Sequence, residues 1–142
     1  MGLNQALDIS VSGISAERVA MELIASNIAN INTTRTAFGG PYRRRIAVMG
    51  EEPVSFDTYL VRAQEQVGGG VEVVDIVEDQ SPFQRVYKPG HPDADAQGFV
   101  DLPNVDLSTE MVDMMYASRL YEANITAFNA TKKMMQDTLQ IQ

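Results

Sequence analysis

The residues with the clearest chemical potential surround the single histidine of the chain. His91 with Asp93 or Asp95 could form an acid/base pair, because an imidazole exchanges its proton near neutral pH. No nucleophile motif or oxyanion-hole pattern accompanies this pair, and a histidine beside a proline is commonly an ordinary loop residue. We therefore interpret the chain as a non-enzyme. An enzyme built on His91 is the alternative, and it predicts that His91→Ala abolishes activity.

The same segment fits part of a calcium-binding loop. Asp93, Asp95 and Gly98 fall at the first, third and sixth places of that template. The twelfth place needs a bidentate glutamate, but Asn104 stands there. We therefore expect an ordered turn in which short acidic side chains accept backbone N–H bonds, with neither a metal nor another cofactor.

Charge and the absence of cysteine exclude further classes of site. Nineteen acidic and eleven basic residues give a net charge of −8, which argues against nucleic acid as a partner. The chain has no cysteine, which excludes disulfides, thiolate metal sites and thiol nucleophiles. No apolar run approaches the ~18 residues of a membrane span, and no basic, apolar signal segment opens the sequence. We expect neither direct membrane insertion nor a cleaved signal peptide.

The elements that must position these residues fall into three parts. All six prolines lie between Pro41 and Pro103, and residues 46–113 carry three basic and fourteen acidic residues. Residues 1–40 and 104–142 contain no proline, and the stretches on either side of 46–113 carry net charges of only +2 and +1. We therefore expect an N-terminal helix within residues 1–34, a small β-rich domain over 35–106 and a C-terminal helix over 107–142.

Residues 3–31 show the apolar periodicity of one long helix. One stripe repeats at every seventh position and consists of Leu7, Ile14, Met21 and Ile28, widened by Leu3, Ile24 and Ile31. A second stripe on another side consists of Ile9, Ala16, Val19 and Leu23. Gly13 weakens the helix, since glycine costs roughly 1 kcal/mol relative to alanine.

The C-terminal part predicts a longer helix that Ser108 or Asp106 can cap, with Glu110 in its first turn. Its first seam consists of Met111, Met114, Tyr121, Ile125, Phe128, Met135 and Leu139. Its second seam consists of Tyr116, Leu120, Ala123, Ala127, Ala130, Met134 and Ile141. A helix with two apolar seams needs two neighbours. With only two helices available, we expect the remaining stripes to meet other chains or to lie exposed; burial of both in an ordinary bundle is the alternative.

The middle of the chain predicts short strands, because β-branched and aromatic residues gather over 42–49, 71–77, 83–87 and 99–102. Turn residues separate these runs, among them Gly68, Gly69 and Gly70. The expected fold class is therefore α+β, with long terminal helices that pair as a coiled coil and a small β-rich middle domain.

Several separated motifs resemble the bacterial flagellar rod and hook family of axial proteins. Residues 26–30 (Ser-Asn-Ile-Ala-Asn) with Thr33 and Thr34 are similar to its N-terminal signature, and residues 121–124 (Tyr-Glu-Ala-Asn) to its C-terminal one. Segments 39–44, 77–79, 82–83 and 89–95 resemble the proximal-rod members of the family. Residues 35–37 (Arg-Thr-Ala) depart from the Pro-Gly-Tyr-like turn of many distal-rod and hook relatives, although another axial protein of the family remains an alternative.

The resemblance implies a structural subunit of the flagellar basal-body rod. Its members pair their terminal helices around the inner tube, carry the middle as an outer domain, and are exported unfolded without a cleaved signal. The implied partners are other copies of the chain, other rod proteins, the flagellar export apparatus and the basal-body rings. A free-standing helical adaptor that binds one protein is the alternative of another class.

Two groups of residues are expected to form the contacts between subunits. The apolar members are Leu7, Ile14, Met21, Ile28, Met114, Tyr121, Ile125, Phe128 and Met135. Asn27, Asn30 and Asn124 are expected to be buried and hydrogen-bonded, fixing register as polar residues do at coiled-coil seams. Because burial on assembly would offset the cost of ordering the helices, we expect the ends of the chain to be poorly ordered in the monomer.

Overall fold

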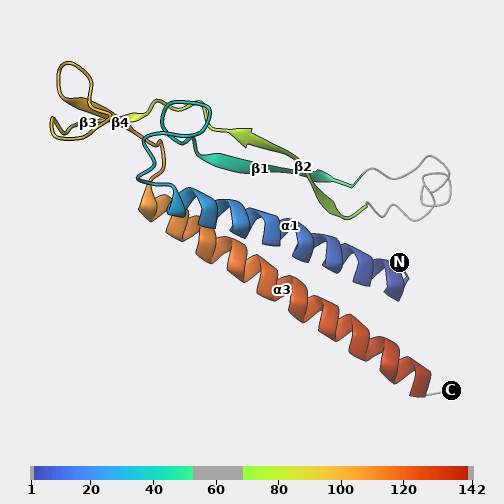
Figure 1. Ribbon diagram of the computed structural model, residues 1–142. Coiled ribbons are helices and arrows are strands. Elements are labelled where there is room, and N and C mark those ends of the chain that lie inside the picture. The colour runs from blue at the N-terminus through green and yellow to red at the C-terminus, as the bar shows by residue number, and fades with distance from the viewer. Residues whose placement is uncertain (1, 53–68, 141–142) are drawn as a thin grey trace.

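The computed structural model describes residues 2–52 and 69–140, and it shows two long helices with a β-rich middle (Figure 1). In chain order the elements are α1 (Leu3–Ala29), β1 (Arg45–Glu51), β2 (Val71–Glu78), β3 (Gln84–Tyr87), β4 (Phe99–Leu102) and α3 (Leu107–Gln140). The α+β class expected from the sequence is confirmed. The first strand begins three residues later than expected, at Arg45, and extends two residues beyond Met49. Ile141 and Gly68 lie outside the described residues.

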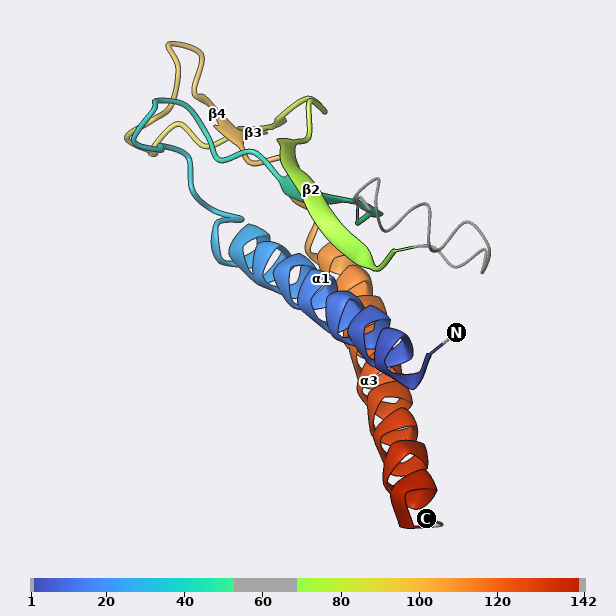
Figure 2. The ribbon, with the colours of Figure 1, turned by 90° about the vertical axis from the view of Figure 1, so that its right-hand side faces the viewer.

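The two helices run antiparallel and side by side, and α3 extends beyond the N-terminal end of α1 (Figures 1 and 2). At ~1.5 Å per residue their lengths are about 40 and 50 Å. Asp106 caps α3, because its Oδ1 accepts hydrogen bonds from the Thr109 backbone N–H at 2.8 Å and from the Thr109 hydroxyl at 3.0 Å. These bonds lower the pKa of Asp106, the backbone bond from Thr109 contributing most. Of the two expected caps, Asp106 is thus the one used.

The strands form two separate hairpins. β1 pairs antiparallel with β2, from Arg45 opposite Glu78 to Glu51 opposite Val71, with an irregularity between Val48 and Met49. This hairpin lies along α1 on the side away from α3 (Figure 1). β3 pairs antiparallel with β4 beyond the C-terminal end of α1. The helix α1 therefore has a neighbour on each of two sides.

The buried core of the described residues is small and partly polar. Its apolar members are Ala16, Tyr42, Val100, Val105 and Ala117, and its polar members are Asn27, Glu110 and Thr131. Asn27 and Glu110 are 1% and 0% exposed and meet where α1, the start of β1 and α3 converge. Hydrogen bonding at this junction, rather than a large apolar core, fixes the helices to the β-rich part.

Candidate functional site

Asn27 lies at the centre of the junction and uses its whole side-chain amide. Its Nδ2 donates to the Arg45 carbonyl at 2.9 Å and to Glu110 Oε2 at 3.0 Å. Its Oδ1 accepts from the Tyr42 hydroxyl at 2.9 Å and from the Arg45 N–H at 3.0 Å. Both donors and both acceptor positions are satisfied, so this buried amide adds no desolvation penalty for unpaired atoms. Asn27 is thus buried and hydrogen-bonded as expected, but its partners belong to its own chain.

Glu110 completes the junction as a fully buried carboxylate. Arg44 Nε donates to Glu110 Oε1, and Arg44 Nη2 donates to Asp113 Oδ2 at 2.8 Å. Burial alone would lower the pKa of Arg44, but the hydrogen bond and charge of Glu110 raise it overall. The backbone N–H of Arg44 also donates to Asn104 Oδ1 at 2.9 Å. The ion pair thereby ties α3 to the segment that enters β1.

The expected interface residues lie mainly where the chain covers its own helices. Asn30, Asn124 and the nine apolar members are all partly buried within the chain. Asn124 packs so closely on α1 that a Cβ at Gly13 would lie 2.8 Å from its Nδ2. Asn30 donates to the Ser26 carbonyl at 2.9 Å and accepts from the Thr33 hydroxyl. Their role between subunits remains a prediction.

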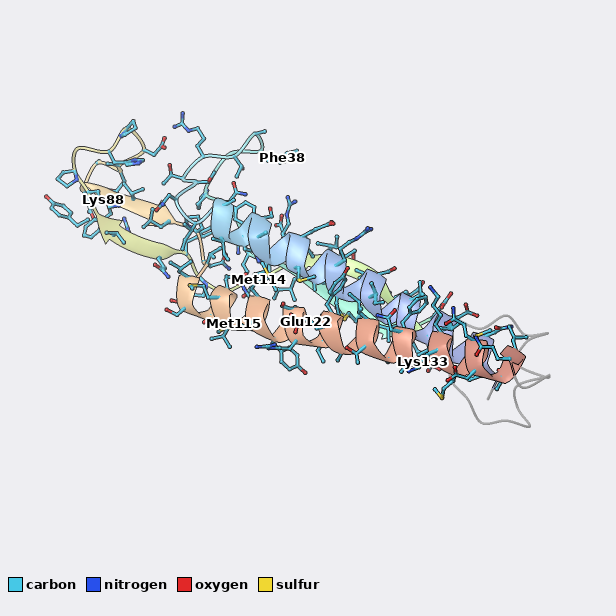
Figure 3. The ribbon with its side chains drawn as sticks, turned by 90° about the horizontal axis from the view of Figure 1, so that it is seen from below. Phe38, Lys88, Met114, Met115, Glu122 and Lys133 are labelled. Carbon is cyan, nitrogen blue, oxygen red and sulfur yellow. The ribbon has the colours of Figure 1, made fainter. Side chains whose placement is uncertain are left out.

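The second seam of α3 is exposed along most of its length. We call the exposed residues Tyr116, Ala123, Ala127, Ala130 and Met134 the outer stripe; Tyr116 and Met134 are 67% and 52% exposed. Leu120, expected in the same seam, is partly buried. Figure 3 shows Met114 between the two helices, and Met115, Glu122 and Lys133 along α3. An apolar stripe on this helix therefore has no cover within the described chain.

Two residues of the first seam were placed wrongly by the periodicity. Leu139 is exposed because α3 extends beyond the N-terminal end of α1 at this point. Met111 is exposed because it follows Glu110, whose side chain faces the junction, and one residue turns the helix by about 100°. The first seam thus holds in the middle of α3 and fails at both ends.

The second stripe of α1, in contrast, is covered by the β1–β2 hairpin. The Val71 N–H donates to Ser12 Oγ at 3.0 Å, and a Cβ at Gly70 would overlap that hydroxyl. Ala16 is buried, and Val19 and Leu23 are partly buried. The expectation that every second stripe meets another chain or lies exposed is therefore wrong for α1, since it omitted the sheet as an intrachain neighbour.

An open groove of about 250 Å³ remains between α1 and β2. Its lining is Ser12, Ser15, Ala16, Val19, Glu52, Val71, Glu72 and Val73. Ala16 is buried and Val19 and Val73 are partly buried, whereas Glu52 and Glu72 are exposed. We call this feature the α1–β2 groove.

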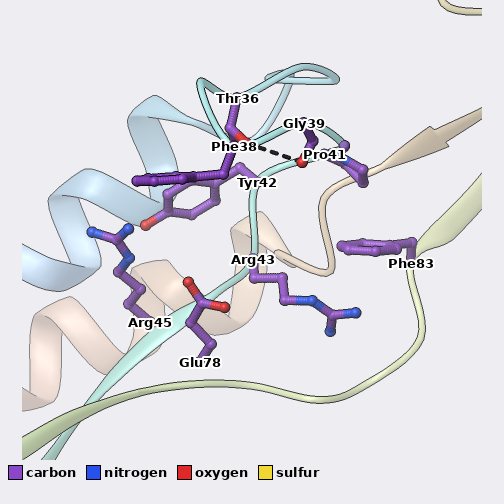
Figure 4. Close-up of a pocket in the computed structure, with 10 residues that line it drawn as sticks. Thr36, Phe38, Gly39, Pro41, Tyr42, Arg43, Arg45, Glu78 and Phe83 are labelled. Atoms are coloured by element: carbon purple, nitrogen blue, oxygen red, sulfur yellow. Dashed lines mark hydrogen bonds between the residues drawn. The ribbon is translucent and has the colours of Figure 1, made fainter.

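Phe38, which the sequence analysis did not single out, lies in solvent in the loop between residues 35–37 and 39–44 (Figure 4). Phe38 is 99% exposed, although the loop around it is tightly bonded. The Thr36 N–H donates to the Gly40 carbonyl at 2.9 Å, and the Gly39 N–H to the Thr36 carbonyl at 3.0 Å. Gly39 and Gly40 adopt φ values of 85° and 77°, which favour glycine. The glycine pair was the only sequence signal of this turn, and it carries no information on the exposure of Phe38.

The segment around His91 forms the ordered turn expected from the sequence. His91 Nδ1 accepts from the Asp93 N–H at 3.1 Å, and Asp93 pairs with Arg35 at 2.7 Å. Asp95 accepts from the Gln97 and Phe99 N–H groups and pairs with Arg85. These contacts lower the pKa of Asp95, the backbone bond from Phe99 contributing most. The side chains of Asp93 and Asp95 therefore hold the turn together.

Two kinds of feature are absent from the described residues, namely a metal-ion cluster and a membrane-spanning helix. Among residues 2–52 and 69–140, no cluster of three histidine or acidic side chains is arranged to hold a metal ion. No helix within those ranges is both long and apolar enough to span a membrane.

Comparison with known proteins relates both ends of the chain to one family. The family described as "Flagella basal body rod protein" matches residues 7–35, which cover most of α1 and the loop after it. The family described as "Flagellar basal body rod FlgEFG protein C-terminal" matches residues 96–141, from the start of β4 through α3. The matched segments are the ones that the Asn27–Glu110 junction joins.

Full-length relatives extend this similarity across the middle. The chain is 44% identical to "Flagellar basal-body rod protein FlgC" of Bacillus subtilis, over 95% of both chains. It is 40% identical to the proteins of the same name from Borreliella burgdorferi and Salmonella typhimurium, over 99% of this chain and 98% of each relative.

Proposed function

We propose that this chain, which belongs to the FlgC family of flagellar basal-body rod proteins, polymerises through its terminal helices into the tubular rod. It is a structural subunit of that rod. In the proposed arrangement the helices of many subunits surround the export channel, and the rod crosses the periplasm and transmits torque from motor to hook. The parts over 1–34 and 107–142 would form the inner tube, and 35–106 the outer domain.

The observation that carries the proposal is the outer stripe of α3. Tyr116 and Met134 are large side chains that remain more than half exposed on a helix whose opposite side is packed against α1. Covering such surface contributes roughly 25 cal/mol per Å². In the proposed rod the stripe meets a different face of the neighbouring subunit, because such heterologous contacts build open helical tubes whereas self-pairing of the stripe would close a dimer.

The expected interface residues are partly buried in the α1–α3 pair, which is compatible with this arrangement. Their partial exposure leaves side-chain surface that a neighbouring helix can cover, for example at Tyr121, Ile125 and Phe128. Torque is then shared among many modest contacts, and no single residue acts as a catalytic group does. We accordingly propose that the chain has no enzymatic role and needs no cofactor.

We propose that the chain is exported unfolded, without a cleaved signal, because its buried core is small. The described residues bury only six apolar side chains, the five of the core and Pro103, and the junction is held by hydrogen bonds that water can replace. A small core lowers the free energy needed to unfold the chain for passage through the export apparatus. Other rod proteins, further copies of the chain and the basal-body rings are the proposed partners of the exported subunit.

The test is Ala127→Asp, which places a charge in the middle of the outer stripe. We expect this variant to fold as a monomer but to be lost from purified basal bodies, with loss of swimming. Asn129→Asp is the matched control, because Asn129 is also exposed on α3 but lies outside the stripe. Normal rods containing Ala127→Asp would refute the stripe as an assembly surface. A complex that saturates at a fixed stoichiometry, instead of open-ended growth with concentration, would favour the adaptor alternative.

A further inference from the structure

We propose that Phe38 of one subunit inserts into the α1–β2 groove of a second copy of the chain. This inference rests on the proposed function and names one of the contacts that would hold the subunits together. It is independent of the outer stripe, because neither Phe38 nor the groove involves α3.

Phe38 has the properties of an anchor for a protein interface. A phenylalanine that is 99% exposed leaves its entire ring in water, which costs free energy that burial would recover. The bonds between Thr36 and the two glycines hold the loop in one shape, so docking would order little additional backbone. Rigid aromatic side chains are enriched among the residues that dominate binding energy.

The groove has a suitable size and lining for that ring. Its volume is about 250 Å³, and a closed apolar cavity of ~150 Å³ is enough to hold benzene. Ala16, Val19 and Val73 supply apolar surface for the faces of a phenyl group. The groove is open along one side, so a loop from outside can enter it.

Phe38 cannot reach the groove of its own subunit. The cavity beside Phe38 is lined by Glu78, at the end of β2, whereas the groove is lined by residues 71–73 at its start. Seven residues of extended strand span about 23 Å. Phe38 and the groove therefore lie near opposite ends of the same hairpin, as a head-to-tail contact between copies requires.

Charge around the two features is complementary, which favours a second copy as the occupant. Arg43 and Arg45 line the cavity beside Phe38 with one acidic residue, Glu78, whereas the charged residues that line the groove, Glu52 and Glu72, are both acidic and exposed. When the ring enters the groove, the two sets of opposite charges approach one another. Such pairs at the rim of an interface contribute to orientation and association rate more than to affinity.

The absence of cysteine makes the contact testable by disulfide formation. Ala37→Cys and Ser15→Cys chains would be produced together in the flagellated source bacterium in place of its own copy; Ala37 is exposed beside Phe38, so the thiol there leaves the ring in place. Basal bodies would then be purified and mildly oxidised, and a dimer joined between positions 37 and 15 would be sought by mass spectrometry. Each chain carries one thiol, so every such disulfide joins two subunits. The matched control replaces Ser15→Cys by Val11→Cys, an exposed position on α1 outside the groove.

A 37–15 dimer that is absent from the control supports the contact. Oxidised basal bodies that hold both variants without this dimer, or a disulfide to a different protein, would overturn it and leave the rod function standing. Absence of the unmodified chain from basal bodies would instead overturn the proposed function.

A competition between chains gives a second readout without thiols. Phe38→Asp and the unmodified chain would be produced together and counted in purified basal bodies. We expect the unmodified chain to predominate by about tenfold or more, since a buried phenyl ring changes an association constant by at least that factor. The melting temperature of Phe38→Asp should be unchanged, because Phe38 contributes no buried surface to the fold. Equal incorporation of the two chains would overturn the inference.

Discussion

The two long helices carry the same kind of sequence pattern but have different surroundings. Both show two apolar stripes, yet α1 has α3 on one side and the β1–β2 hairpin on another, whereas α3 leaves its outer stripe in solvent. Periodicity therefore gives the number of faces that need cover, but it does not distinguish a cover within the chain from one supplied by a partner. The difference leaves α3 with the longer uncovered apolar stripe, whereas most of the second stripe of α1 is covered within the subunit.

The contrast between α1 and α3 is tested by placing the same charged residue on each helix and comparing the loss of unfolding free energy. Ala16→Asp places a carboxylate on the buried second stripe of α1, where Ala16 is 4% exposed, and should cost about 3 kcal/mol of unfolding free energy. Ala127→Asp places the same group on exposed α3 and should cost less than about 1 kcal/mol, chiefly helix propensity. Urea unfolding of the isolated chain measures both; similar losses would contradict this contrast between the two helices.

The next largest loss of unfolding free energy is expected at the junction between the two helices. Glu110→Ala leaves Arg44 without its buried partner and should cost about 3 kcal/mol, because Arg44 is one-fifth exposed and keeps Asp113. Asp113→Ala removes the more exposed partner of Arg44 and should cost less than about 1 kcal/mol. Chemical denaturation followed by helical circular dichroism compares them. A smaller loss for Glu110→Ala than for Asp113→Ala would count against the junction as the main tie.

The smallest effect concerns the closest approach of the two helices. Gly13→Ala gains up to about 1 kcal/mol of helix propensity but brings a Cβ within 2.8 Å of Asn124 Nδ2, so its net effect should be near zero or destabilising. In an Asn124→Ala background the contact is gone, and Gly13→Ala should become stabilising by about 1 kcal/mol. Thermal unfolding of the four chains gives the coupling between the two sites. Full stabilisation by Gly13→Ala alone would mean that the helices are less closely packed.

The sequence predicted the elements better than their mutual arrangement. Strand and helix limits follow from local composition, and the exposed second seam of α3 followed from counting apolar faces. The bond between Asn27 and Glu110 joins residues 83 positions apart, so no local pattern contains it. The cover of α1 by the hairpin is likewise a long-range contact, from Ser12 to Val71. Phe38 is exposed because no other part of the described chain covers it, and sequence periodicity carries no information on such tertiary cover.

Both helices begin or end near the junction and point away from it, so the two ends of the chain lie at one pole of the molecule and the β3–β4 hairpin at the other (Figure 1). A subunit with unlike poles has a direction, and a tube in which such subunits stack in one orientation has two chemically different ends. Addition of subunits can then be confined to a single end, and the structure grows with a fixed polarity without any external marker of which way is outward.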